Sequence, residues 1–425
     1  MRLFTIAEQL KCQPFPRHDA QIPEKEPDYA GLIAQSGLPA ETADALLAAA
    51  EEHLSGSAVK WYLSWLSSQL FRDKLDPEQG AEWIPDQIGI LSEEGNYAFF
   101  AMLALCGFPS RQRSFIASGL PEESWRGALE DLSLWIAHFR KNRGITGIAP
   151  STFRWEHRVL NASPLTLGRL QFRLQPFAGK VQVYRRRSDG FVQAFASAGV
   201  RCNRSGQLDG VDGEFDPVAW NTVFSVTPDA ISGNPLTPSG RILQERLTLN
   251  AAEWIPVLRE GDLVLDTHIP ENGVLDPAEC ARSMRRGWEF FTSRYPERKI
   301  RGFSCASWLL DPQYEMLLRP DSRILAFLRQ YYLFPTLEGG SAALWRIFGE
   351  DGLKDGPEHA PQTTSMQRNV ADFLLNGGKL RGGGGFFLAE DLDRYGAMPY
   401  RNQIPATTVA APPPAENPEP GERCP

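Results

Sequence analysis

At 425 residues the chain is long for a single hydrophobic core, so two domains are expected. A net charge of -8 without a basic stripe argues against a nucleic-acid binder, and no window reaches the ~18 apolar residues that a membrane span needs. Six scattered cysteines, with no Cys-x-x-Cys pair, favour reduced thiols in a cytoplasm. Neither these thiols nor the six scattered histidines have the spacing of a metal site.

Residues 1–150 have the pattern of a helical domain. Helices are predicted over 41–54, which is rich in Ala, Leu and Glu, and over 59–71 and 121–143, where apolar residues recur at helical spacing. The apolar run 97–106 is typical of a buried helix. The many aromatic residues of this part are therefore interpreted as core.

A second domain is predicted over 151–390, beginning with strands. Residues 167–174 alternate cleanly, and 180–184 and 191–198 are shorter candidates. The run Arg185, Arg186 and Arg187 is interpreted as a solvated strand end. Residues 201–250 are rich in turn residues and are predicted to form a loop-rich insertion, either a long loop or a flap that could act as a lid.

The stretch 261–335 predicts strand, helix, strand, short helix and strand. The strands are expected at 261–270, 300–310 and about 322–332, and Asp276 followed by Pro277 predicts the start of the long helix. A helix of this length joins a parallel pair of strands, whose ligands bind at the carboxyl ends. These ends carry four polar side chains: Asp266, His268, Cys305 and Ser307.

The rest of the chain predicts two helices, a turn and a tail. The helices are expected near 341–349 and 363–376, and the glycines at 382–385 are interpreted as a flexible turn before a final strand. Residues 399–425 are rich in Pro, Ala and Glu and are expected to be a disordered tail.

Four phrases, at 103–109, 167–172, 268–270 and 307–312, resemble a bacterial family of acyltransferase-domain proteins. The resemblance implies an N-acyltransferase N-terminal helical domain followed by a GNAT-like C-terminal domain with a mixed sheet, hence an α+β fold. It implies a direct attack of an amine on a thioester. Acyl-CoA, or an acyl-carrier protein, would be the co-substrate, with no tightly bound cofactor, and a small-molecule amine would be the acceptor.

The GNAT geometry implies a donor site between two splayed strands, 262–269 and 300–310. Thr267 and Ile269 would line it from the first strand and Cys305, Ser307 and Trp308 from the second. The sequence also allows a simpler interpretation, in which Trp308 belongs to the core and the two small residues only leave room or pack.

Asp266 and His268 project to one face of their strand and could form a general base, with Tyr314 of the following short helix as the acid. The alternatives are a histidine that caps the strand end and a tyrosine that packs. A hydrolase with Ser307 or Cys305 as nucleophile is a third interpretation, but the surrounding residues do not form a nucleophile elbow.

The predicted pyrophosphate loop departs from the GNAT pattern. Residues 269–277 contain one glycine, two acids and Pro270 where a glycine-rich loop would present backbone N–H groups. Arg282, Arg285 and Arg286 on the next helix could contact the phosphates of coenzyme A, or could form a solvated face. The departure supports the runner-up hypothesis, a catalytically weak scaffold that binds a ligand or partner.

Overall fold

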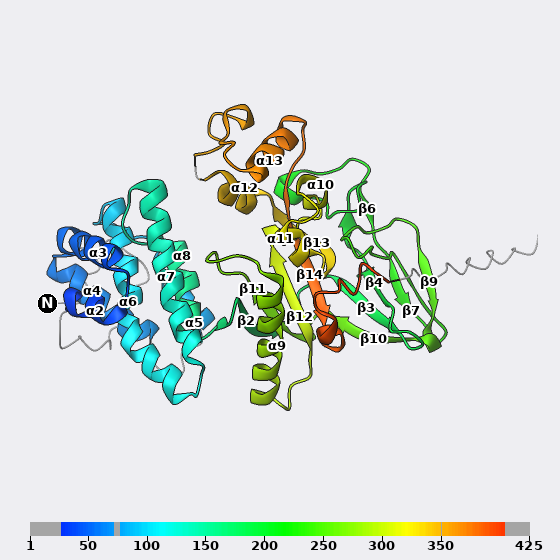
Figure 1. The fold of residues 1–425 in the computed structure, drawn as a ribbon, viewed down its shortest axis with the longest axis horizontal. Coiled ribbons are helices and arrows are strands. Elements are labelled where there is room, and N and C mark those ends of the chain that lie inside the picture. Colours follow the sequence, from blue (N-terminus) through cyan, green and yellow to red (C-terminus); the bar gives the residue numbers. More distant parts are fainter. Residues whose placement is uncertain (1–26, 72–76, 350, 404–425) are drawn as a thin grey trace, which may run out of the picture. The chain divides into compact units, whose positions relative to one another are not determined.

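A computed structural model describes residues 27–71, 77–349 and 351–403 (Figure 1). Most of the tail predicted over 399–425 lies outside these residues. The model divides into two compact units. The first comprises residues up to 175, 265–299 and 344–376, and the second comprises 176–264, 300–343 and 377 onward. No helix of the described ranges is long and apolar enough to cross a membrane.

The first part of the chain is entirely helical, as predicted (blue to cyan in Figure 1). Helix α6 is central to its core, because residues 97–105 are all buried. Helix α7 ends at Gly144, whose φ of 69° closes the last turn. The helices are α2 Tyr29–Ser36, α3 Ala40–His53, α4 Ser57–Leu70, α5 Pro77–Ala81, α6 Glu93–Ala117, α7 Glu122–Arg143 and α8 Pro150–Leu160.

The strand predicted over 167–174 is in fact a hairpin of β1 (Leu165–Leu167) and β2 (Leu170–Pro176). The chain turns at Gly168, whose φ is 82°, a conformation that glycine adopts at little cost. Ser283 closes the turn, since its Oγ donates to the Leu167 carbonyl (2.6 Å) and accepts from the Leu170 N–H (2.9 Å). The alternation of residues predicts a single strand, whereas the turn at Gly168 divides this stretch into two.

Strands also run through the segment predicted to be loop-rich. A three-stranded sheet has the order β10-β3-β4, and the residues from 201 to 250 hold five short strands and many hydrogen-bonded turns. The elements are β3 Val181–Arg186, β4 Val192–Ala196, β5 Arg201–Cys202, η1 Val211–Gly213, β6 Trp220–Asn221, β7 Phe224–Val226, β8 Ala230–Gly233, β9 Leu247–Asn250, η2 Ala251–Glu253 and β10 Trp254–Arg259.

The largest sheet has six strands in the order β1-β2-β11-β12-β14-β13. Together with the helical region it confirms the α+β class. Asp276 caps α9 as expected, accepting from the N–H groups of Ala278 and Glu279. The elements are β11 Leu263–His268, α9 Pro277–Arg294, β12 Ile300–Ser307, η3 Trp308–Leu310, α10 Tyr314–Leu317, α11 Arg323–Leu328, β13 Tyr332–Gly339, α12 Ser341–Phe348, η4 Pro357–His359, α13 Ser365–Leu375, β14 Arg381–Leu388 and η5 Ala389–Arg394.

The prediction of a strand near 322–332 is wrong. Residues Arg323–Leu328 form α11, and the strand β13 begins only at Tyr332. Leu325, Phe327 and Leu328 are buried. A short apolar run of this kind fits a buried strand and a buried helix equally well, so its periodicity does not separate the two.

The glycine run is strand, and not the flexible turn that was predicted. Strand β14 pairs antiparallel with both β12 and β13, and its glycines are buried. A Cβ on Gly383 would lie 2.1 Å from the Leu310 carbonyl oxygen, and one on Gly384 would lie 2.3 Å from the Phe334 ring. Glycine is used here because neighbouring groups approach the strand too closely for any side chain.

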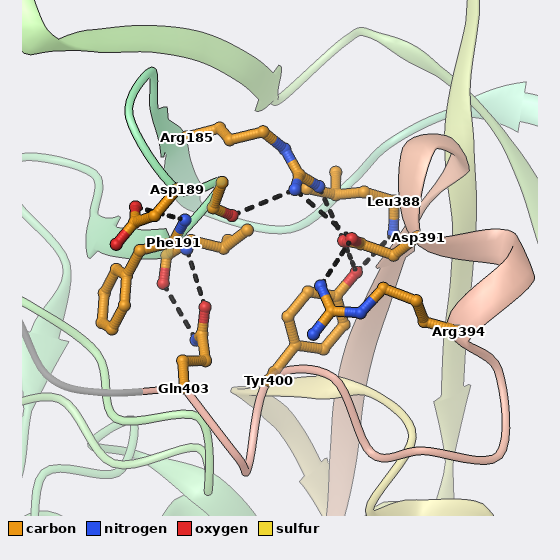
Figure 2. Close-up of polar contacts among 10 residues, drawn as sticks. Arg185, Asp189, Phe191, Leu388, Asp391, Arg394, Tyr400 and Gln403 are labelled. Atoms are coloured by element: carbon orange, nitrogen blue, oxygen red, sulfur yellow. Dashed lines mark hydrogen bonds and ion pairs between the residues drawn. The ribbon is translucent and has the colours of Figure 1, made fainter.

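A buried ion pair corrects the interpretation of Arg185 as part of a solvated strand end. Asp391, 2% exposed, accepts from Arg185 Nη2 at 2.6 Å and from the Tyr400 hydroxyl at 3.0 Å (Figure 2). Burial raises the pKa of Tyr400 well above its usual value, so this hydroxyl keeps its proton and donates. Gln403, three residues after Tyr400, also bonds to β4. Its side-chain amide accepts from the Val192 N–H (2.7 Å) and donates to the Val192 carbonyl (3.1 Å).

Removing the Asp391 carboxylate should destabilise the protein strongly. Asp391→Ala leaves the buried Arg185 guanidinium without its carboxylate, which typically costs about 3–5 kcal/mol. Glu260→Ala, which breaks an exposed pair with Lys180, should change the free energy of unfolding by about 1 kcal/mol or less. Urea unfolding of both variants provides the comparison, and equal losses would contradict the structural role of Asp391.

Candidate active site

Asp266 and His268 pair at the carboxyl end of β11, where the sequence predicted that they would meet. Asp266 Oδ2 lies 2.9 Å from His268 Nε2. Asp266 is 7% exposed, whereas about a quarter of the His268 side chain (26%) reaches solvent. The Nε2 atom is buried. It lies within ion-pair distance of Asp266 Oδ2, but the two atoms are not aligned for a hydrogen bond. Nδ1 is therefore the ring nitrogen that remains to take a proton from a substrate.

Arg173 of β2 shares the same carboxylate oxygen. Its Nη2 donates to Asp266 Oδ2 at 3.1 Å. A guanidinium at this distance offsets the cost of burying the carboxylate and fixes its orientation. The histidine ring thus faces a carboxylate that is held from a second strand.

Trp155 of α8 packs against the His268 ring. The two ring centroids are 4.9 Å apart and the ring planes are inclined by 55°. The indole Nε1 donates to Asp131 Oδ2 of α7 at 2.8 Å, which fixes the position of the tryptophan. An indole face is a favourable neighbour for an imidazolium, because its π electrons attract a cation.

Two buried carboxyl groups stand behind Trp155. Glu156 is fully buried and Asp131 is 8% exposed. Burial, and then the charge of Asp131, raises the pKa of Glu156 well above its usual value. Burial also raises the pKa of Asp131, but the hydrogen bond from the Trp155 indole opposes this rise. Glu156 is consequently the carboxyl that holds the proton of the pair, and Asp131 carries the charge.

A cavity of about 210 Å³ lies beside Asp131, between α7, the β1–β2 turn and the segment after β11. Helix α7 approaches β1 closely because Gly127 has no side chain: a Cβ there would lie 2.3 Å from Thr166 Oγ1. Ser124 Oγ also donates to the Thr166 carbonyl at 2.6 Å. Polar groups of Asp131, Thr166, Gln171 and Asn272 line the cavity.

The segment after β11, which corresponds to the predicted pyrophosphate loop, is tied to Arg169. The guanidinium donates to three backbone carbonyls, those of Val274 (2.9 Å), Pro270 (3.0 Å) and Gly273 (3.3 Å). The loop backbone is thus oriented by a side chain of the β1–β2 turn. Nothing in the sequence pattern of the loop itself indicated this anchor.

Two of the three arginines that could contact phosphates are paired with carboxylates. Arg286 makes a two-pronged contact with Glu123 of α7 (2.5 and 2.7 Å), and Arg282 pairs with Glu279 one turn earlier on α9. Either guanidinium would have to exchange its carboxylate for a phosphate. Thr267 is buried with its Oγ1 unbonded among the described residues, and Ile269 is half-buried.

The other predicted site residues belong to the second unit. Tyr314 is fully buried, its ring meets Trp308 edge to face (6.2 Å), and its hydroxyl has no partner among the described residues. Burial, followed by the charge of Asp311, raises the pKa of Tyr314. Cys305 is buried. Ser307 Oγ accepts from the Leu309 N–H (3.2 Å), so it caps the short helix η3 and is not placed as a nucleophile.

Four residues of this site were missed in the sequence: Arg173, Trp155, Asp131 and Glu156. The one available signal was Glu156, a charged residue on the same helical face as Phe153 and Leu160, which are buried. Arg173 appeared only as the polar member of an alternating strand. Among the described residues no group of three or more His, Cys, Asp or Glu side chains could hold a metal ion.

The raised pKa of Glu156 predicts a dependence of stability on pH. The folded protein holds a proton on Glu156 that the unfolded chain loses above about pH 4.5, so rising pH withdraws stability. Glu156→Gln removes this term. The variant should gain stability relative to the natural protein by up to about 1.4 kcal/mol per pH unit from pH 5 upward.

Urea unfolding at pH 5, 6, 7 and 8 measures this difference. Glu130→Gln is the matched control, because Glu130 is an exposed carboxyl on the same helix as Asp131, and its stability difference should stay nearly constant. A Glu156→Gln difference that is equally flat would contradict the assignment of the proton to Glu156.

The site can now be compared with known proteins. Residues 27–162 match the model of the N-acyltransferase N-terminal domain, and residues 165–387 match the GNAT-like C-terminal domain. A comparison with curated protein sequences finds no match.

Among solved structures, an acyltransferase in complex with decanoyl-CoA and teicoplanin is 22% identical, with a TM-score of 0.58. An acyltransferase in complex with decanoyl-CoA, and a mutant acyltransferase in complex with octanoyl-CoA, are each 21% identical, with TM-scores of 0.59. Each likeness covers 91% of this chain and 99% of the other, and establishes a shared fold. The family match covers most of the described residues, and the chain therefore belongs to the family with a GNAT-like C-terminal domain, here preceded by an N-acyltransferase N-terminal domain.

Proposed function

We propose that the protein is an acyltransferase that moves an acyl group from a thioester, with acyl-CoA as the donor, to an amine. The single observation that carries the proposal is the Asp266–His268 pair, a histidine beside a buried carboxylate at the end of β11, the strand at which the family resemblance leads us to expect the donor. The solved structures with the same fold, which hold octanoyl-CoA or decanoyl-CoA, support acyl-CoA as the donor class.

The proposed reaction is a direct attack. The amine nitrogen forms a bond to the thioester carbonyl carbon while His268 Nδ1 takes its proton. Asp266, held by Arg173, stabilises the imidazolium that results, and the indole of Trp155 adds to this effect. The tetrahedral intermediate then collapses, the C–S bond breaks, and the departing thiolate receives a proton. Tyr314 is the proposed source of that proton.

The donor-binding role extends to the other residues predicted from the family geometry. Thr267, Ile269, Cys305, Ser307 and Trp308 are the proposed contacts of the acyl-pantetheine arm. Residues 1–150 and 151–390 are the proposed domains; the first supplies Asp131 to the acceptor side, and Trp155 follows at the start of the second. Arg282 and Arg286 would contribute to phosphate binding only after leaving Glu279 and Glu123.

A second candidate function is a binding scaffold without transferase activity. It is favoured by one observation, the loop after β11, whose three carbonyls are committed to Arg169 and which contains Pro270 where a donor N–H would be useful. Measurements of donor binding and of turnover distinguish the two functions, because only a transferase both binds the thioester donor and transfers its acyl group.

Acyl-CoA should stabilise the protein against heat. A ligand at about 100 times its dissociation constant adds about 2.7 kcal/mol to the stability of the folded state. A melting temperature that rises from free coenzyme A through acetyl-CoA to octanoyl-CoA and decanoyl-CoA is the expected outcome, because longer chains bury more apolar surface. An unchanged melting temperature with all four ligands would favour the scaffold, or a donor carried by a protein.

Substituting the base should abolish turnover without removing the donor. His268→Gln cannot accept the proton, and transfer from decanoyl-CoA to a primary amine should slow by about 10²- to 10⁴-fold. The melting shift with decanoyl-CoA should persist. His359→Gln, a change at an exposed histidine, is the control and should retain full activity. Full activity of a folded His268→Gln variant would remove His268 from the mechanism.

A further inference from the structure

Asp131 is a buried carboxylate without a cationic partner. It is 8% exposed, and its only N–H donor among the described residues is the indole of Trp155. No basic group of those residues lies within ion-pair distance of it. This differs from Asp266, which has Arg173 and His268, and from Asp391, which has Arg185.

An uncompensated buried charge is costly. Even after relaxation the penalty is typically several kcal/mol per ion, and proteins usually avoid it by pairing the charge. Glu156 does not remove the charge, because it is the member of the pair that holds the proton. A cation placed beside Asp131 would therefore be bound favourably, since it restores the attraction that the carboxylate lost on leaving water.

The cavity beside Asp131 has the size and the polar groups for such a cation. Its volume of about 210 Å³ corresponds to roughly seven water molecules at ~30 Å³ each, which is enough for an amino group and a few carbon atoms. A protonated primary amine has three N–H donors. Asp131, the Thr166 hydroxyl and the Gln171 side-chain oxygen are acceptors on the wall of the cavity.

The cavity adjoins the proposed base. Pro270, which lies two residues after His268, forms part of its wall, and Trp155 spans from Asp131 to the face of the His268 ring. The indole thus lies between Asp131 and the imidazole, and Pro270 is the residue of the cavity wall that is nearest to His268 in the chain.

We propose that this cavity is the acceptor subsite and that it selects a primary aliphatic amine, bound as the ammonium ion with Asp131 as its counter-ion. The proposal rests on the proposed acyl transfer and names the acceptor class for it. Asp131 recognises the ammonium. His268 first takes one proton from it, and the neutral amine that results then attacks the thioester carbonyl carbon. The larger part of an acceptor would remain outside, because the cavity admits only the aminoalkyl end.

Direct binding tests the subsite without a donor. Butylamine is the probe, and butanol is its uncharged counterpart of nearly equal size; calorimetry with the full chain measures both. Butylamine should bind more tightly than butanol, and Asp131→Asn should weaken butylamine by about 10- to 100-fold, the loss of a hydrogen bond to a charged group. Glu122→Gln, at an exposed carboxyl of α7 outside the cavity, should change the affinity less than about 3-fold.

A pH series on the natural protein needs no variant. Butylamine affinity should fall as Asp131 is protonated at low pH, while butanol affinity should not follow it. The other titratable or charged groups near Asp131 are Glu156, which is already protonated, the more distant Glu271 and Arg346, and two further residues of the cavity wall, Glu130 and Arg169. Arg169 donates to three backbone carbonyls of the segment after β11. Glu271→Gln should leave the profile in place. Equal affinity for butylamine and butanol, or an unchanged affinity in a folded Asp131→Asn variant, would overturn the proposal.

Kinetics separate this proposal from the proposed function. With decanoyl-CoA as the donor, Asp131→Asn should raise the KM for butylamine by about 10- to 100-fold and leave the melting shift with decanoyl-CoA unchanged. A protein that binds decanoyl-CoA and transfers its acyl group, but does not discriminate butylamine from butanol, would refute the subsite alone. A protein that binds butylamine but shows neither a melting shift with acyl-CoA nor acyl transfer would refute acyl-CoA as the donor and leave the subsite standing.

Discussion

One carboxylate oxygen organises the candidate active site. Asp266 Oδ2 lies 3.1 Å from the Arg173 guanidinium of β2 and 2.9 Å from the His268 ring of β11. Two neighbouring strands therefore place a side chain against the same oxygen atom. The arrangement compensates the burial of Asp266 and sets the histidine ring in one orientation. Because the carboxylate occupies Nε2, it also decides which ring nitrogen can accept a proton. The roles proposed for Trp155 and for the cavity both depend on this orientation of the His268 ring.

Three of the five buried aspartates among the described residues are compensated in different ways. Asp391 is surrounded by donors and joins the C-terminal segment to β3, which is a structural use of charge. Asp266 pairs with the Arg173 guanidinium and orients the His268 ring. Asp131 is left with an indole N–H and a protonated neighbour. These three aspartates differ in how completely their charge is compensated. The fully compensated Asp391 has a structural role, whereas the least compensated, Asp131, is the one proposed to bind a ligand cation.

Local pattern was enough to predict much of the fold. Alternation placed Asp266 and His268 on one face of a strand, Asp276 and Pro277 marked the start of α9, and the helices of the first domain followed from apolar spacing. These features depend on residues within a few positions of one another. The failures depend on distant neighbours. The glycines of β14 are explained by Leu310 and Phe334, and Arg185 by Asp391, about 200 residues away in the chain. Trp155 and Asp131 join two helices, and no pattern in either helix specifies that contact.

The tie between Arg169 and the segment after β11 has a consequence for the choice of donor. A backbone whose carbonyl oxygens at Pro270, Gly273 and Val274 are all held by one guanidinium has little freedom to wrap its amides around a pyrophosphate. The nucleotide end of coenzyme A would then contribute little affinity, and recognition would shift to the fatty chain and the pantetheine arm. Selectivity among donors would accordingly be a matter of chain length and apolar fit, as in a lipid-binding protein, more than of nucleotide recognition.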